Sequence, residues 1–159
     1  MKLYLVQHGE AKPESEDPER PLTDRGEETV RRMAAWASQV GLKVDQIRHS
    51  GKRRAEQTAA LLGERLNPPQ GVIAVAGLTP IDDVRPVAEA IPAEQAAEML
   101  VGHLPHLSRL ASLLLTGNPE SGVLRFQMAG IVCLSNQAGK WAVHWVMPPD
   151  LLASSSTAR

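Results

Sequence analysis

The feature that most constrains the fold of this 159-residue chain is a compact apolar run at its start, from Lys2 to Gln7, which stops at His8-Gly9. A short run of β-forming residues that ends in polar residues and a glycine predicts a buried strand. Strands that are apolar throughout are typical of parallel sheets, because helices cover both faces of such sheets. The run is too short for a signal-peptide core or a membrane span. We therefore expect an interior strand with polar side chains at its carboxyl end.

Strands and helices alternate along the rest of the chain. The pattern predicts four helices: one that Thr23 caps and Gly41 ends, one that Ser50 caps and Pro68-Pro69 closes, one from Asp82 or Asp83 through Ala90, and one over His106–Leu115. Between them it predicts strands over Val44–His49, Val72–Val75 and Glu98–Gly102. The last helix is followed by a predicted hairpin of Ile131–Ser135 and Trp141–Met147 around Asn136–Gly139. This order predicts an α/β fold, a three-layer α/β/α sandwich with a mostly parallel central sheet. We expect one domain over residues 1–152 and a disordered tail over 153–159.

Composition excludes several functions. The formal net charge of −1 leaves no general basic field to bind nucleic acid, so anion binding must be local. The single cysteine, Cys133, cannot form an internal disulfide, and it reads as a buried apolar residue in a reducing compartment. No stretch reaches membrane-spanning length. We expect a cytoplasmic monomer that binds neither membranes nor nucleic acid.

Three polar clusters follow predicted strands: Gln7 to Glu10, Ser50 to Arg54, and Gly102-His103. Ligands of parallel sheets bind outside the carboxyl ends of the strands, so these clusters are expected to meet. A neutral imidazole is a competent nucleophile near pH 7. Arginine offers a planar fork of donors that matches phosphate oxygens, and the start of a helix also attracts anions. The clusters therefore predict phosphoryl-transfer chemistry.

Five segments in this order resemble the motifs of one family: LVQHGEA, RPLTDRG, HSGKRRAEQTA, LTPIDDV and LVGHLPHL. Together they span most of the chain, and it resembles the histidine phosphatase superfamily, within it the small SixA-type phosphohistidine phosphatases. The resemblance implies a phosphoglycerate mutase-like fold and no metal or organic cofactor.

The resemblance also implies roles for particular residues. His8 would attack phosphorus and become phosphorylated. Arg54 and His103 would hold the phosphoryl oxygens and stabilise the transition state. Gly9 and Arg20 would join them in binding phosphate. The chain has no room for the long insertions that cover the site in larger relatives, so an open site and a phosphoprotein substrate, phosphohistidine first, are expected.

One residue departs from the motif: Gln7 stands where the family has arginine. Its amide still allows phosphate binding, but losing a charge-assisted bond costs about 1.5–3 kcal/mol, or roughly 10–100-fold in rate. Lys52 or Arg53 would compensate if either turned inward. Gly51, in place of the motif's proline, matters less. Two interpretations follow, a slowed enzyme and a phosphate-binding protein without useful turnover.

The general acid is open at this stage. Asp82 and Asp83 lie in a suitable segment, but acidic residues are also common at the start of a helix. A phosphohistidine releases an imidazole, which needs less protonation than an alkoxide does. Hence a strong general acid is not required for that substrate.

The remaining polar residues have simpler interpretations. His103 and His106 have the spacing of zinc ligands, but Pro105 lies between them and no third ligand is evident. His49 and His144 fit strand patterns and are expected to be structural. Glu10 is either a support for the site or a solvated acid.

Three functions therefore compete. The first is a phosphohistidine protein phosphatase, the second a small-molecule phosphomonoesterase of the same fold, and the third a catalytically impaired phosphoprotein-binding module. Fold alone does not choose among them.

Overall fold

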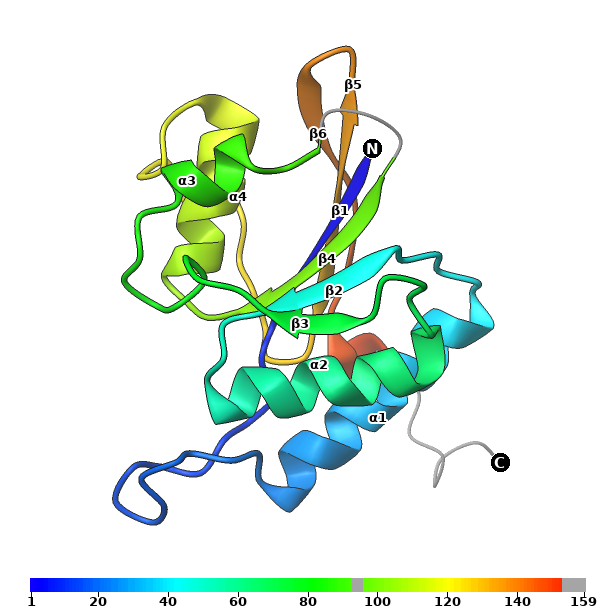
Figure 1. Cartoon of the computed structure of the whole chain (residues 1–159), viewed down its shortest axis with the longest axis vertical. Coiled ribbons are helices and arrows are strands. Elements are labelled where there is room, and N and C mark those ends of the chain that lie inside the picture. Colours follow the sequence, from blue (N-terminus) through cyan, green and yellow to red (C-terminus); the bar gives the residue numbers. More distant parts are fainter. Residues whose placement is uncertain (93–95, 153–159) are drawn as a thin grey trace.

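The structure is a computed structural model that describes residues 1–92 and 96–152, so the predicted tail at 153–159 lies outside the described residues. Its elements are, in order, β1 (Lys2–Gln7), α1 (Asp24–Gln39), β2 (Gln46–His49), α2 (Arg53–Leu66), β3 (Val72–Ala74), α3 (Arg85–Glu89), β4 (Ala97–Gly102), α4 (His106–Thr116), β5 (Ile131–Gln137), β6 (Lys140–Met147) and a short 3-10 turn, η1 (Pro149–Leu151). Figure 1 shows the helices packed around a single sheet.

The sheet has the order β3-β2-β4-β1-β5-β6. Its first four strands run parallel, whereas β5 is antiparallel to β1 and β6 is antiparallel to β5. The prediction of a mostly parallel sheet is confirmed. The first strand of the chain lies in the interior of the sheet, as its apolar run predicts.

Both faces of β1 are buried, and each contributes to a separate core. Tyr4 and Val6 pack with residues of α1 and α2, while Leu3 and Leu5 pack with residues of α4. Alternate side chains of a strand point to opposite faces, which explains this division. The three-layer α/β/α sandwich is therefore confirmed.

Several predicted boundaries are wrong. Helix α3 begins at Arg85, because Asp82 accepts hydrogen bonds from the backbone and hydroxyl of Thr79 and closes a separate turn. The hairpin turn is Ala138-Gly139 alone, with φ of +52° and +81°, as the tight two-residue turn of a twisted hairpin requires.

Ser50 does not cap the following helix as predicted. Lys52 is the N-cap of α2, and the Ser50 hydroxyl accepts the Lys52 amide N–H at 3.2 Å. In contrast, the predicted cap of α1 is confirmed, since Thr23 accepts the N–H of Gly26 at 2.9 Å.

The register of the sheet aligns the carboxyl ends of three strands. Gln7 of β1 lies opposite Gly102 of β4, and His49 of β2 lies opposite Val101. The residues that follow these strands must leave the sheet at the same edge. None of the described helices is long and apolar enough to cross a membrane.

Candidate active site

His8 follows β1 directly and is buried. Its backbone N–H donates to the carbonyl of Gly102 at 3.0 Å, which ties it to the end of β4. Its ring Nδ1 lies 2.7 Å from the Gly9 carbonyl oxygen. Because a carbonyl only accepts, Nδ1 carries the proton and Nε2 keeps its lone pair. Burial is the main cause that lowers the pKa of His8, and Arg54 and Arg20 lower it further.

Gly9 orients His8 and packs against α1. Its N–H donates to Thr58 Oγ1 at 3.0 Å, and its carbonyl accepts from His8, so neither backbone group is left for a ligand. A Cβ on Gly9 would come within 2.8 Å of Val30 Cγ2. The protein itself thus uses both backbone groups of Gly9, and the part of Gly9 in phosphate binding stays a prediction.

Two side chains of helix α2 hold the backbone of the segment between β1 and α1 by hydrogen bonds. Thr58 accepts from Gly9 while its own hydroxyl donates to the carbonyl of Arg54 at 2.7 Å. Gln57 Oε1 accepts the N–H of Leu22 at 2.7 Å. These two neighbours in the Arg-Ala-x-Gln-Thr motif thus hold the backbone of a distant segment rather than a ligand.

Arg54 lies in the first turn of α2 and is 9% exposed, with a buried Nε that has no hydrogen-bond partner in the described chain. Arg20 has a left-handed backbone, φ +49°, and its Nε donates to the Lys12 carbonyl at 3.1 Å. Its positive charge lowers the pKa of both His8 and Arg54, behind burial. Both predicted arginines therefore lie near His8.

His103 follows β4 and is 1% exposed. Its ring centroid is 5.0 Å from that of His8, with the planes inclined at 52°. Its Nε2 lies 2.7 Å from Ser50 Oγ, whereas its buried Nδ1 has no partner among the described residues. Burial, then the charges of His8, Arg54 and Lys52, lower the pKa of His103 to about 3. The ring is neutral at physiological pH.

Gln7, which stands where the motif has arginine, is the last residue of β1. Its carbonyl accepts the N–H of Ala129 at 2.8 Å, and its side-chain Oε1 is buried without a hydrogen-bond partner in the described part of the chain. Unpartnered buried polar atoms are rare in folded proteins. Here Gln7, Arg54 and His103 each contribute one, which indicates that a polar ligand completes this site.

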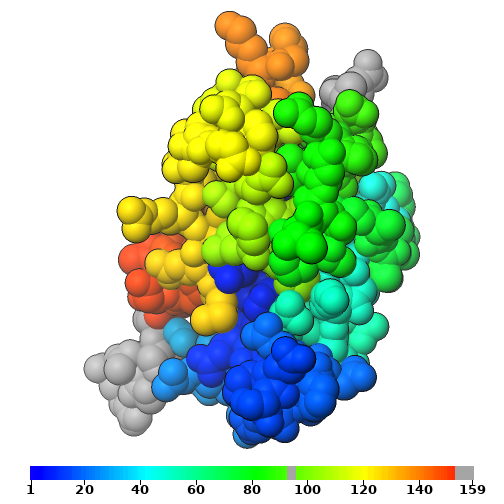
Figure 2. Space-filling view, turned by 90° about the vertical axis from the view of Figure 1, so that its left-hand side faces the viewer, coloured from blue at the N-terminus to red at the C-terminus, as the bar shows by residue number. Residues whose placement is uncertain are grey.

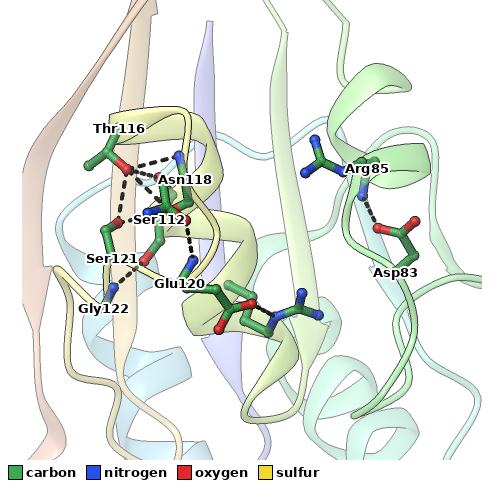
Figure 3. A network of polar contacts seen from close by, with 9 residues as sticks. Asp83, Arg85, Ser112, Thr116, Asn118, Glu120, Ser121 and Gly122 are labelled. Carbon is green, nitrogen blue, oxygen red and sulfur yellow. Dashed lines mark hydrogen bonds and ion pairs between the residues drawn. The ribbon is translucent and has the colours of Figure 1, made fainter.

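The two candidate acids differ. Asp82 lies near His106 and Lys52, whose charges lower its pKa after the larger effect of its hydrogen bonds to Thr79. Asp83 is exposed and its Oδ1 accepts the N–H of Arg85 at 3.0 Å, as Figure 3 shows. Asp83 therefore shapes the start of α3, whereas Asp82 interacts with His106.

The two possible compensating cations also differ. Arg53 forms an ion pair with Glu56, with Nη1 and Oε1 2.8 Å apart. Lys52 forms no such pair in the described chain, and its charge acts on His103 and Asp82. Of the two, Lys52 is the one on the side of the site.

The other polar residues have structural environments. His49 Nδ1 accepts the N–H of Gly51 at 3.1 Å, and burial lowers the pKa of His49. His144 is exposed on β6. Glu10 accepts the Thr23 hydroxyl at 2.8 Å, so it supports the start of α1. Among the described residues, no group of three or more His, Cys, Asp or Glu side chains is arranged to hold a metal.

A cavity of about 520 Å³ adjoins the site. Its lining includes Gln7 and Leu104, the neighbours of His8 and His103, together with Met128. Figure 2 shows the dark blue start of the chain reaching the surface among segments that are distant from it in the sequence. The site is therefore built by strand ends from across the chain.

Known proteins share both sequence and fold with this chain. The family model of the histidine phosphatase superfamily (branch 1) matches residues 3–82. Phosphohistidine phosphatase SixA of Escherichia coli K12 is 30% identical over 154 residues, which is 94% of each chain. An uncharacterised protein of Picosynechococcus sp. is 32% identical and covers 91% of this chain and 90% of its own.

A solved structure agrees with these relatives. The protein histidine phosphatase SixA, complexed with tungstate, superposes with a TM-score of 0.83 at 29% identity, covering 94% of this chain and 98% of its own. The matched family segment contains β1, the loop after it and the Arg54 motif, so the likeness to the family model includes the His8 and Arg54 parts of the site, whereas His103 lies outside that segment. The chain belongs to the histidine phosphatase superfamily, as a SixA-type member, and it is a phosphatase.

Proposed function

We propose that this phosphatase removes the phosphoryl group from phosphohistidine on another protein, by way of a phosphorylated His8. One observation carries the proposal. The Gly9 carbonyl holds the His8 Nδ1 proton and so leaves Nε2 as a free nucleophile, beside buried Arg54 and His103 atoms that lack partners in the described chain. A phosphoryl group, which is rich in acceptors, satisfies such atoms.

The reaction then has two displacements. His8 Nε2 attacks phosphorus, and the new N–P bond forms as the substrate's N–P bond breaks. The electron pair of the broken bond goes to the substrate imidazole, which takes a proton from water. Water next attacks the phosphoryl group on His8, releasing inorganic phosphate and restoring the neutral ring. Arg54 and His103 donate to the equatorial oxygens in both steps, where charge develops.

The state of Asp82 favours an imidazole leaving group. Hydrogen bonds from Thr79 lower the pKa of Asp82, so its carboxyl group is ionised near neutral pH and is a poor proton donor. Release of an alkoxide from a sugar phosphate would need such a donor. Release of an imidazole needs less help, which supports phosphohistidine over the phosphomonoester alternative.

The relatives and the surface add support. The two SixA proteins are by name a phosphohistidine phosphatase and a protein histidine phosphatase, and the second binds tungstate, a tetrahedral oxyanion like phosphate. Near the site, Leu104 and Met128 are 39% and 44% exposed. Exposed apolar side chains beside a polar site suit a protein partner better than a small sugar.

The test compares kcat/KM for a histidine-phosphorylated protein domain with kcat/KM for sugar phosphates. We expect the phosphohistidine protein to be the better substrate by at least tenfold, and faster sugar phosphate turnover would overturn the substrate class. His8→Ala should abolish both activities, and His144→Ala, a change at an exposed histidine, should change neither. If the natural chain is no faster than His8→Ala, the role of His8 is wrong.

A second measurement looks for the intermediate itself. Rapid acid-free quenching during turnover of ³²P-labelled substrate should trap label on the natural chain. The label should be acid-labile and alkali-stable, as a phosphoramidate is, and absent from His8→Ala.

A further inference from the structure

The two site histidines use their ring nitrogens differently. His8 donates Nδ1–H to the Gly9 carbonyl and presents a bare Nε2. His103 has the opposite environment, since its Nε2 is engaged by Ser50 Oγ at 2.7 Å and its Nδ1 is the buried atom without a partner in the described chain. What His103 can do for a phosphoryl oxygen therefore depends on which of its nitrogens carries the proton.

The contacts of Ser50 decide this. A hydroxyl has one proton and two lone pairs. The Lys52 amide N–H occupies one lone pair of Ser50 Oγ at 3.2 Å, and His103 Nε2 is the acceptor within reach of the proton. The reverse arrangement, with Nε2–H donating, would leave the Ser50 proton without an acceptor in the described chain. It would also leave a bare lone pair at Nδ1, which repels an anion.

We propose that Ser50 is a positioning residue that donates to Nε2 of His103, and so fixes the His103 tautomer in which Nδ1–H is the donor to the phosphoryl group. The proposal rests on the proposed function of this site. Both histidines then adopt the same tautomer but present opposite ends of it, His8 its lone pair and His103 its proton.

The neutrality of His103 makes this selection necessary. Burial, His8 and Arg54 lower the pKa of His103 to about 3, so the ring has a single proton before substrate binds. A doubly protonated ring would donate from either nitrogen, but a neutral ring donates only from the one that carries the proton. Buried geometry further restricts the ring, because His103 is 1% exposed and lies against His8.

The deciding experiment is ¹⁵N NMR of the histidine rings in the full chain, without substrate, at pH 7.5. We expect His103 Nδ1 to be protonated and Nε2 to be unprotonated. A protonated Nε2 in the natural chain would overturn the proposal. The measurement needs no turnover, so failure of the proposed function would leave this result standing, and the reverse also holds.

Variants of Ser50 supply the functional readout. Ser50→Ala should weaken the Nδ1–H preference and lower kcat by about 10–100-fold, less than the loss of a whole transition-state donor, because part of the population keeps the donating tautomer. Ser50→Thr keeps the hydroxyl group and should retain both the Nδ1–H tautomer of His103 and the natural kcat. Ser38→Ala, at an exposed serine of α1, should change neither. Unchanged tautomer and kcat in a folded Ser50→Ala protein would contradict the proposal.

Discussion

The two ends of the central sheet differ in how their buried polar groups are satisfied, because the buried Glu98 near the amino ends has an ion-pair partner in Arg48 at 3.5 Å. On the α1 face of the sheet, between its middle and the amino ends of β1 and β4, a cavity of about 550 Å³ is lined by Tyr4, Trp36 and Trp145. These rings pack on one another, Tyr4 on Trp145 at 5.9 Å and Trp36 on Trp145 at 5.6 Å. At the carboxyl ends, His103 and Arg54 are buried with polar atoms that have no partners in the described chain.

This difference shows that cavity size is a poor guide to the chemistry of this fold. The catalytic candidates lie where buried polar atoms are incomplete, while the apolar cavity contributes packing. A protein stabilises itself by pairing its buried polar groups, so a cluster that stays unpaired indicates a ligand. The amino end is accordingly expected to determine stability and the carboxyl end to determine turnover.

Arg54→Ala provides the largest expected separation of the two ends. It removes the buried guanidinium whose Nε is unpartnered in the described chain. Removing a preorganised donor to developing charge costs about 10²–10³ in kcat. We expect that loss in steady-state turnover of the phosphohistidine substrate, with little change in the urea midpoint of unfolding.

Trp145→Ala is the matched change at the other end. Trp145 contacts both Tyr4 and Trp36, so its truncation should lower the free energy of unfolding by roughly 2–4 kcal/mol. At temperatures where the variant stays folded, kcat should remain within about twofold of the natural value. A stable Trp145→Ala protein with collapsed kcat would break the division between the ends.

Sequence alone predicts the carboxyl end better than it predicts the rest. The apolar run of β1 and the polar clusters after three strands identify the nucleophile candidate and its edge of the sheet. The strand order cannot be predicted in this way, because β1 pairs with β4 and β5, which are distant from it in the sequence.

The roles of Ser50 and Gly9 could not be predicted from the sequence. A serine just before a helix fits an N-cap, so nothing in the pattern signals that Ser50 binds His103 instead. A glycine after the nucleophile suggests close approach of a ligand, yet Gly9 is small because Val30 lies against it. Both depend on neighbours that only the tertiary fold supplies. The Gln57-Thr58 pair of the motif is the sequence signal for the two side chains that bind the backbone of Gly9 and Leu22.

The pH dependence of the free energy of unfolding should also distinguish the two ends of the sheet. The four buried histidines (His8, His49, His103 and His106) lie at or just beyond carboxyl ends of parallel strands, and burial lowers the pKa of each. Below pH 6.5 these histidines bind protons in the unfolded chain but stay neutral in the folded chain. The free energy of unfolding should therefore fall as pH decreases, by up to about 1.4 kcal/mol per pH unit for each such histidine, until the folded pKa is reached.

Urea titrations between pH 7.5 and 5 measure this slope. His106→Leu should reduce it, because it removes one buried histidine that is fully enclosed. His144→Gln, at an exposed position, should leave it unchanged. A flat profile in the natural chain would show that the folded and unfolded chains bind equal numbers of protons, so that burial does not lower the pKa of these rings. Saturating phosphate should also flatten the slope, since a bound anion favours the charged form of His8 and His103.

The smallest expected effects concern the charge that Gln7 lacks. Gln7→Arg restores the motif cation and should raise kcat by about tenfold, within the range of one charge-assisted bond. Lys52→Ala should lower kcat by about threefold in the natural chain, because an exposed ammonium on the His103 side of the site is screened by water. Arg53→Ala is its control, since Arg53 is paired with Glu56.

A double-mutant cycle tests whether Lys52 compensates for Gln7. If both cations serve the same phosphoryl group, Lys52→Ala should matter less once Gln7→Arg is present, so the two changes should not be additive. Equal effects of Lys52→Ala in both backgrounds would show that Lys52 acts only as a general positive charge near the site. Slower turnover by Gln7→Arg would instead show that the carboxamide is adapted to its neighbours, and the site would then differ from its relatives by more than a missing charge.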